Sequence, residues 1–268
     1  MNAHRVLPKL RWPLRLQRRP VPRPLPPLEH GKYTVKLVND THEFRQALRL
    51  RYEVFNLELK EGLQASHSTG HDFDEFDAVV DHIIVKCAED DSVIGTYRLQ
   101  TGATAANHLG YYSAREFDFT PYEPYRNEVL ELGRACIEQR HRKTQVLTLL
   151  WKAIAQYALA RGCRLLIGCS SLTTQDPVIG ARVFAQMQNF LAPAEMQTAP
   201  QSAYAFELRD GETNEEAKIP KLLRAYLAAG AQICGPPAID REFRTIDFLT
   251  LLDLGRVPKG ARVRFMGE

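Results

Sequence analysis

The chain has 268 residues, of which 44% are hydrophobic and 25% charged, an ordinary globular composition that suits one large domain or two small ones. Its five cysteines are odd in number and show no C-x-x-C spacing, which favours buried thiols in a reducing cytoplasm over a disulfide framework or a zinc site. No stretch approaches the roughly 18 apolar residues of a membrane span, and the N-terminal residues lack the apolar run of a secretory signal. We therefore expect a cytoplasmic protein, soluble or peripheral to a membrane.

Residues 1–32 form a basic, proline-rich segment. They hold eight Lys or Arg residues against one Glu, a charge of +7, so the total of +3 leaves −4 for the other 236 residues. Seven prolines disfavour helix and remove backbone donors, so we expect an extended, mobile tail before a single domain at 33–268. Apolar residues among the arginines suit contact with an anionic membrane on its inner face, and a plain disordered leader is the alternative.

The first half of the domain alternates between strand and helix. Tyr33–Val38 predicts a strand, and a capping box at Asp40 predicts a helix that ends near Phe55. Residues 56–78 form a long polar loop of a kind that is uncommon unless it serves function. Residues 79–101 predict a hairpin of two β-rich runs with a polar turn.

The second half continues the alternation. Val129–Ile137 predicts a strand, and Thr144–Arg161 is the clearest helix, with apolar residues at helical spacing and a glycine directly after it. The alternation predicts an α/β domain. The remaining predicted elements are strands at 164–169, 232–239 and 245–252 and helices at 176–190 and 220–229.

Three charged clusters lie on or beside predicted strands, where solvated surface explains them poorly. A partly buried guanidinium without a carboxylate is costly, so we expect the acidic loop to pair with the arginines and with a substrate amine; a solvated loop is the alternative. A calcium loop of the EF-hand type fails because Asp77 stands where glycine is required. We expect no metal, although His71 or His82 leaves a transition-metal site open. The clusters are Arg51 with Phe55, the loop with Asp74 and Asp77, and Glu131 with Arg134 beside Arg98.

The motifs Arg51-Tyr-Glu-Val-Phe55, Asp74-Glu-Phe-Asp77, Gly95-Thr-Tyr-Arg98-Leu and Glu131-Leu-Gly-Arg134 resemble those of acyl-homoserine lactone synthases. Together with the runs that begin at Asp81, Tyr112, Leu150 and Gly168, the chain resembles more closely the ornithine acyl-carrier-protein N-acyltransferases, grouped with hemolysin-like acetyltransferases. The resemblance covers roughly residues 35–190. It implies the GNAT-type acyltransferase fold, a mixed central sheet flanked by helices.

The same resemblance implies an activity. A (3-hydroxy)fatty acyl group would pass from acyl-carrier protein to the α-amino group of an amino acid, with L-ornithine as the expected acceptor and lyso-ornithine lipid as the product. No cofactor would be bound permanently, and the acyl-phosphopantetheine of the carrier would be the co-substrate. Arg51, Phe55 and Arg98 would belong to the substrate site.

The predicted strand-to-helix turn at 139–144 departs from the acetyl-CoA-dependent pattern. Those enzymes cradle a pyrophosphate with a glycine-rich turn at a helix start, and this turn has no glycine. Arg140, Arg142 and Lys143 suit an acidic carrier protein and its phosphopantetheine instead. A basic exposed turn without a partner is the alternative.

Aminolysis of a thioester needs a neutral amine and a group that receives its proton. Glu131 is the candidate base, directly or through a water, provided that its pocket raises its pKa and that Arg134 has another partner. Arg134, the second catalytic candidate, would with Arg98 orient a substrate carboxylate or the acidic loop. Asp74 and Asp77 would hold a cationic side chain or brace the arginines. A structural pair of Glu131 with Arg134 is the alternative.

Other functions remain open. The acceptor could be glycine, serine, tyrosine or lysine, or the enzyme could be an acyl-homoserine lactone synthase. A non-catalytic protein that uses the same fold to bind a membrane or a partner is a further alternative. Nucleic acid is not expected, because residues 33–268 are net acidic and aromatic residues are not interleaved with the basic ones.

Overall fold

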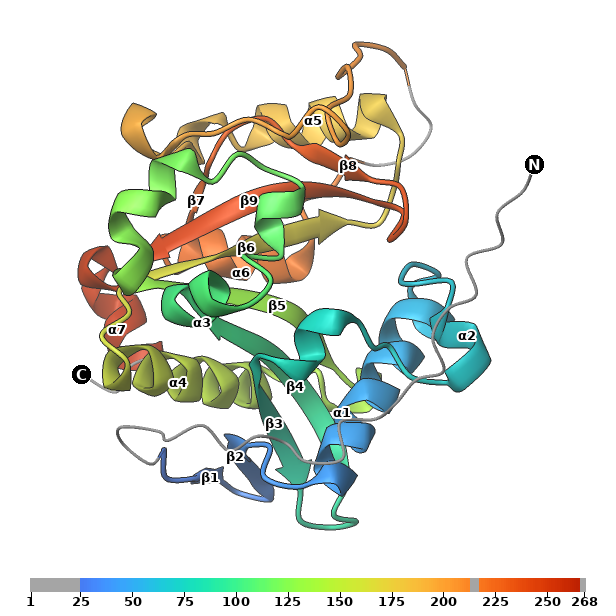
Figure 1. Ribbon diagram of the computed structural model, residues 1–268, viewed down its shortest axis with the longest axis vertical. Coiled ribbons are helices and arrows are strands. Elements are labelled where there is room, and N and C mark those ends of the chain that lie inside the picture. Colours follow the sequence, from blue (N-terminus) through green and yellow to red (C-terminus); the bar gives the residue numbers. More distant parts are fainter. Residues whose placement is uncertain (1–24, 213–216, 266–268) are drawn as a thin grey trace.

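A computed structural model describes residues 25–212 and 217–265 of the chain, and these residues form a mixed nine-stranded sheet flanked by helices (Figure 1). The strands are β1 (Leu28–His30), β2 (Tyr33–Leu37), β3 (Asp81–Cys87), β4 (Val93–Thr101), β5 (Val129–Ile137), β6 (Leu165–Leu172), β7 (Gln232–Ile233), β8 (Ala238–Asp240) and β9 (Thr245–Asp253). The helices are α1 (Thr41–Tyr52), α2 (Ser66–Thr69), α3 (Gly102–Asn107), α4 (Thr144–Ala160), α5 (Pro177–Gln186), α6 (Lys221–Ala228) and α7 (Lys259–Phe265). None of these helices is both long and apolar enough to cross a membrane.

The predicted helices and strands are present, with three differences in extent. The run at 232–239 is two strands, because Gly235-Pro236-Pro237 interrupts it and proline has no N–H for a sheet ladder. The helix expected at 176–190 ends at Gln186, and a 3₁₀ turn follows. The first helix continues as a π-helix, Glu53–Glu58, a rare form that is frequent at functional sites.

The N-terminal boundary also differs from the expectation. We expected an extended tail up to residue 32, but Leu28–His30 pairs with β2, and Leu25 and Leu28 pack against the main apolar cluster. The expectation for residues 1–24 stays a prediction, because that basic segment lies outside the described residues.

Helices cover both faces of β2–β5. Alternate residues of β3 point to opposite faces, so Ile83 and Val85 contact the α4 side while Ile84 contacts the α1 side. The apolar stripe of α4 packs on the first face, and α1 packs on the second. β3 is therefore apolar on both faces, which explains its continuous hydrophobic run.

The sheet divides at β5 and β6, the one parallel pair among the described strands. The two strands pair from Val129 with Leu165 to Glu131 with Ile167, and both then continue without pairing to each other (Figure 1). Beyond that point, β5 stays with β4 and β6 stays with β9. A Cβ on Gly168 would lie 2.2 Å from the Leu132 carbonyl oxygen, so only glycine fits where the strands part.

A β-bulge marks the same part of β5. The register with β4 shifts between Thr96, which faces Cys136, and Arg98, which faces Gly133. The bulge adds one residue to β5, and Arg134 lies within it with a φ of 50°, a conformation that is uncommon outside glycine. Such bulges re-aim side chains, and this one lies beside the gap between the two halves of the sheet.

Candidate active site

A cavity of about 550 Å³ lies between the diverging halves of the sheet. β4, β5, β6, the start of α4 and part of α6 contribute to its wall. The cavity brings together six of the predicted site residues: Phe55, Arg98, Glu131, Arg134, Arg142 and Lys143. Arg51, Asp74 and Asp77 are absent from its wall but bond to one another or to arginines on it. Arg140 is the one predicted residue outside both groups.

Arg51 at the end of α1 is fully buried and is held by two aspartates. Its Nε donates to Asp72 Oδ2 at 2.6 Å, and its Nη1 and Nη2 donate to the two oxygens of Asp77 at 2.6 and 3.0 Å. Burial opposes the ionisation of Asp77, but Arg51 and Arg98 outweigh it and hold the pKa of Asp77 below its ordinary value. The carboxylates therefore compensate the buried guanidinium.

Asp74 joins the other two arginines to this cluster. Arg98 Nη1 lies 2.7 Å from both oxygens of Asp74, and Arg134 Nη2 donates to Asp74 Oδ2 at 3.0 Å. Arg134 Nε also lies 3.2 Å from Asp72 Oδ2. Asp74 caps the 3₁₀ helix Glu75–Ala78, and Asp77 accepts the Asp74 N–H in return. Three arginines and three aspartates from α1, the long loop and the adjoining strands thus form a charge-balanced network.

Aromatic rings fix the plane of the Arg134 guanidinium. Its carbon lies 4.9 Å from the centre of the Tyr112 ring and 4.4 Å from that of Phe243. Phe55 meets Phe243 edge to face, with ring centres 5.6 Å apart. Phe55 therefore supports the wall through Phe243, and Arg134 presents an oriented cation to the cavity.

Glu131 is the last residue of β5 that pairs with β6, and it is buried. Its two carboxylate oxygens accept N–H groups from Tyr112 at 2.9 Å and Ser113 at 2.7 Å. Burial raises the pKa of Glu131 above its ordinary value, although the Tyr112 and Ser113 bonds oppose that shift. Among the described ion pairs, Arg134 contacts aspartates and not Glu131, so the two residues have different partners.

Residues at the start of α4 line the cavity. The helix has no side-chain N-cap, so its first N–H groups have no side-chain acceptor there. Arg142 donates to Glu58 Oε2 at 2.6 Å and to the Ile137 carbonyl at 2.9 Å, which ties the turn to the π-helix. The exposed Arg140 bonds Glu138 at 2.6 Å. The glycine-free turn is a 3₁₀ helix, Gln139–His141.

A second cavity of about 110 Å³ adjoins the first. Both share Tyr97, the bulged part of β5 from Leu132 to Ala135, and Tyr226 of α6. The Tyr97 and Tyr226 hydroxyls are 2.5 Å apart at this shared wall. The rest of the smaller cavity is mainly apolar, with Trp151, Ile154, Leu166, Leu252 and Val257 in its wall.

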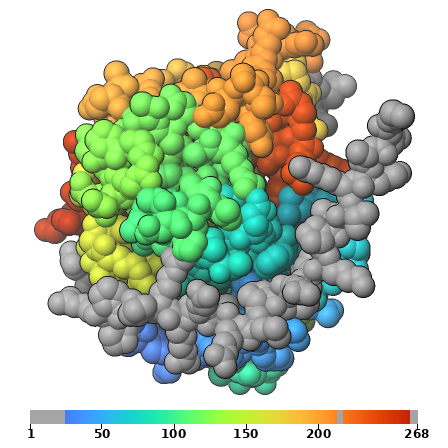
Figure 2. Space-filling model, in the orientation of Figure 1, coloured from blue at the N-terminus to red at the C-terminus, as the bar shows by residue number. Residues whose placement is uncertain are grey.

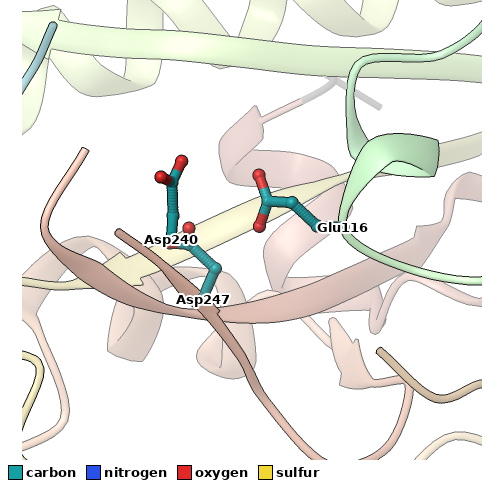
Figure 3. Close-up of side chains that lie close together, drawn as sticks. All are labelled: Glu116, Asp240 and Asp247. Carbon is teal, nitrogen blue, oxygen red and sulfur yellow. The ribbon is translucent and has the colours of Figure 1, made fainter. Parts of the chain in front are cut away.

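Four further carboxylates in the wall of the larger cavity were missed in the sequence: Glu61, Glu116, Asp240 and Asp247. The last three form a group in which one oxygen of each lies within 4.8 Å of the others, and their side chains converge from the segment after β4, from β8 and from β9 (Figure 3). Glu116 lies in segment 102–128, for which no element was predicted and which forms much of one face of the molecule beside residues 190–212 (Figure 2). Asp247 could have been identified as a candidate site residue from the sequence, because it is an acidic residue within an apolar predicted strand.

In sequence, the chain is similar to known acyltransferases. The family model of the acetyltransferase (GNAT) domain matches residues 50–152. The L-ornithine N(alpha)-acyltransferase of Rhodobacter capsulatus is 33% identical over 82% of this chain and 90% of its own length. The protein of the same name from Agrobacterium fabrum is 31% identical over 85% of this chain and 83% of its own length.

Solved structures show the same fold at low identity. The acyl-homoserine lactone synthase LasI has a TM-score of 0.52 at 13% identity, over 88% of this chain and 95% of its own. FeeM, an N-acyl amino acid synthase from uncultured soil microbes, has a TM-score of 0.51 at 10% identity, over 90% of this chain and 97% of its own. The GNAT-type α/β fold predicted from the sequence is thereby confirmed.

Proposed function

Since the chain belongs to the L-ornithine N(alpha)-acyltransferase family and is an N-acyltransferase, we propose that it moves a (3-hydroxy)fatty acyl group from acyl-carrier protein to the α-amino group of L-ornithine. The product is a lyso-ornithine lipid, and the second product is the free thiol of the carrier. One observation carries this proposal: β5 and β6 separate after Glu131. The cavity between them is lined by the start of α4 and by the Glu131 carboxylate, and it adjoins an apolar recess.

The donor enters along the start of α4. A helix N-terminus attracts phosphate, and the missing side-chain cap leaves those N–H groups of the first turn that do not already bond the Lys143 carbonyl available to the phosphate of phosphopantetheine. Arg140, Arg142 and Lys143 add positive charge at this turn, which suits the acidic surface of a carrier protein. The bonds of Arg140 to Glu138 and of Arg142 to Glu58 fix the positions of both guanidinium groups and offset part of their charge before the carrier arrives.

The acyl chain lies in the apolar recess. Trp151 and Ile154 of α4 and Leu166 of β6 are in its wall, and burial of a methylene group there contributes about 0.8 kcal/mol. Because this recess shares the bulged part of β5 with the larger cavity, a chain in it places its thioester beside the unpaired edge of β5. Backbone N–H groups along that edge are the candidates to stabilise the oxyanion.

The amine attacks from the larger cavity. Deprotonation of an α-amino group with a pKa of roughly 8 costs about 1.4 kcal/mol at pH 7, so the base acts mainly as the nitrogen–carbon bond forms. Glu131 receives the proton, directly or through a water, and its raised pKa suits that role. The carbon–sulfur bond then breaks, and the leaving sulfur takes up a proton.

The cluster of three arginines and three aspartates orients the acceptor. Asp74 and Asp77 already bond the arginines and cap a 3₁₀ helix, which favours the bracing role among the two roles considered for them. Arg134 and Arg98 are the cavity residues that face an acceptor carboxylate. We place this reaction in the cytoplasm, with the basic segment that precedes Leu25 in contact with the inner face of an anionic membrane.

The test is acyl transfer by the purified full chain. Carrier-dependent release of free thiol with L-ornithine, together with an Nα-acyl product, supports the proposal. Release with glycine, serine, tyrosine or lysine but not with ornithine would reassign the acceptor. No carrier-dependent thiol release with any amino acid would refute the enzymatic proposal.

A further inference from the structure

A second buried acidic cluster lies in the larger cavity, apart from the arginine network. Glu116, Asp240 and Asp247 are 2%, 6% and 3% exposed, and one oxygen of each lies within 4.8 Å of the others (Figure 3). β8 and β9 pair antiparallel, with Asp240 opposite Thr245, which brings the two aspartates to the same part of the sheet. Glu116 reaches them from the turn after Ser113–Arg115.

No cation compensates this cluster among the described residues. Their ion pairs include none to Glu116, Asp240 or Asp247, whereas Asp72, Asp74 and Asp77 have three arginines. The arginines therefore compensate the lost hydration of Asp72, Asp74 and Asp77, whereas no described cation compensates that of the acidic cluster. Burial and the neighbouring acids raise the pKa of Glu116 well above its ordinary value and that of Asp247 to about 6.

Two of the buried oxygens also lack a hydrogen-bond donor. Glu116 Oε2 and Asp247 Oδ1 have none among the described residues, although buried carboxylate oxygens are ordinarily satisfied. Asp247 Oδ2 accepts from the Thr245 hydroxyl at 3.1 Å, and Asp240 Oδ1 accepts the backbone N–H groups of residues 242 and 243. The side chains of Cys169 and Ser171 also interact with Glu116 and Asp247, respectively, and partly oppose the rise in their pKa values. The two unsatisfied oxygens therefore point to a ligand that donates hydrogen bonds and carries positive charge.

We infer that Glu116, Asp240 and Asp247 bind the side-chain ammonium group of a diamino acid acceptor. This inference rests on the proposed function, since it assigns the acceptor's second nitrogen a site in the same cavity. An ammonium group has three donors, which matches three converging carboxylates. Calcium, in contrast, takes six to eight oxygen ligands, more than three carboxylates held at these separations readily supply.

The same cluster explains why one nitrogen reacts and the other does not. Nearby carboxylates favour the protonated form of an amine, and a protonated amine has no lone pair for attack on a thioester. An ammonium group held by the cluster is thus protected, while the α-amine is free to lose its proton to Glu131. The cluster would therefore determine both the preference for a diamino acid and acylation at Nα.

The test compares L-ornithine with L-norvaline, which has the same carbon chain without the second amine. With acyl-carrier protein as donor, we expect the wild-type chain to prefer ornithine by on the order of 100-fold or more in kcat/KM. Asp247→Asn should lower that ratio at least about tenfold through a higher KM for ornithine, with little change for norvaline. Asp118→Asn, an exposed aspartate outside the cavity wall, is the matched control and should keep the ratio.

Four outcomes separate the interpretations. A folded Asp247→Asn variant that keeps the wild-type ratio overturns the inference and leaves ornithine acylation standing. Ornithine turnover that EDTA abolishes and magnesium or calcium restores also overturns it, because the cluster would then hold a metal. A wild-type chain that does not acylate ornithine overturns the proposed function itself. If Asp247→Asn does not fold, Glu116→Gln takes its place, and the same loss of preference is the supporting result.

Discussion

Asp247→Asn should stabilise the protein at neutral pH although it lies in the core. Burial, together with the negative charge of Asp240, raises the pKa of Asp247 to about 6, whereas the pKa in the unfolded chain is about 3.9. The folded form of the wild type is therefore penalised as the pH rises from about 4 through 6. Asparagine does not ionise, so the variant escapes that penalty.

The magnitude follows from the difference in pKa. About two units correspond to about 3 kcal/mol of unfolding free energy when Asp247 is fully ionised. Some of this gain is lost if the asparagine amide places its N–H₂ group against a neighbouring donor, so we expect about 1–3 kcal/mol at pH 8. The difference should fall towards zero below about pH 4, where the aspartate is protonated in both states. For a chain of this size, 2 kcal/mol raises the Tm by roughly 4–8 °C.

The assay is urea unfolding of both proteins at pH 4, 6 and 8, followed by tryptophan fluorescence. Glu195→Gln, which removes an exposed carboxylate from a surface turn, is the control and should show no pH-dependent difference. An Asp247→Asn variant that is less stable than the wild type at pH 8, or equally stable at all three pH values, would contradict the claim that ionised Asp247 destabilises the folded protein. Such a result would mean that a cation already compensates Asp247 in the free protein.

Three further variants test the rest of the site. Arg51→Gln leaves Asp72 and Asp77 without their buried partner and should lower the unfolding free energy by about 3–5 kcal/mol at pH 7. The loss should shrink as the pH falls below about 4, because the lowered pKa of Asp77 contributes stability only while the carboxylate stays ionised. Glu131→Gln should reduce kcat about 10²–10⁴-fold at pH 7, with a smaller change in the KM for the amine. Reversal of charge at Arg140, Arg142 and Lys143 to Glu should lower kcat/KM for the acyl carrier about tenfold or more at low salt and less at high salt.

Each of these has an outcome that contradicts it. An Arg51→Gln variant that loses less than about 1 kcal/mol in a urea titration would show that the aspartates find another partner. Retention of most turnover by Glu131→Gln in a thiol-release assay would make the carboxylate an anchor for the Tyr112–Ser113 backbone and not the base. Unimpaired use of the carrier by the charge-reversed variant would place the docking surface elsewhere.

The sequence predicted those helices and strands whose apolar residues recur at a regular spacing. The helix expected at Thr144–Arg161 is Thr144–Ala160 in the structure, because its apolar stripe has the helical spacing and Gly162 follows it. Asp40 caps the first helix as its spacing from Glu43 indicates. Segment 102–128 was beyond prediction, since its one short α-helix, α3, and its 3₁₀ turns are too short to show an apolar period and depend on tertiary packing.

The ion-pair network of three arginines and three aspartates could be predicted from the sequence, whereas the cluster of Glu116, Asp240 and Asp247 could not. Acidic residues crowded into one loop near arginines on strands indicate pairing, because a buried guanidinium needs a carboxylate. Glu116 and Asp247, in contrast, are far apart in the sequence, and their proximity depends on how segment 102–128 folds over β9. Nor does sequence reveal that Glu131 bonds two backbone N–H groups, because those belong to a turn without a motif.

The most direct test of the central claim is one reaction with the purified full chain, 3-hydroxyacyl carrier protein and L-ornithine. Free thiol and acylated ornithine are measured together, and fragmentation in a mass spectrometer locates the acyl group. We predict equal amounts of thiol and product, with the acyl group on Nα. Acylation of the side-chain nitrogen, or thiol release without an acylated amino acid, would contradict it.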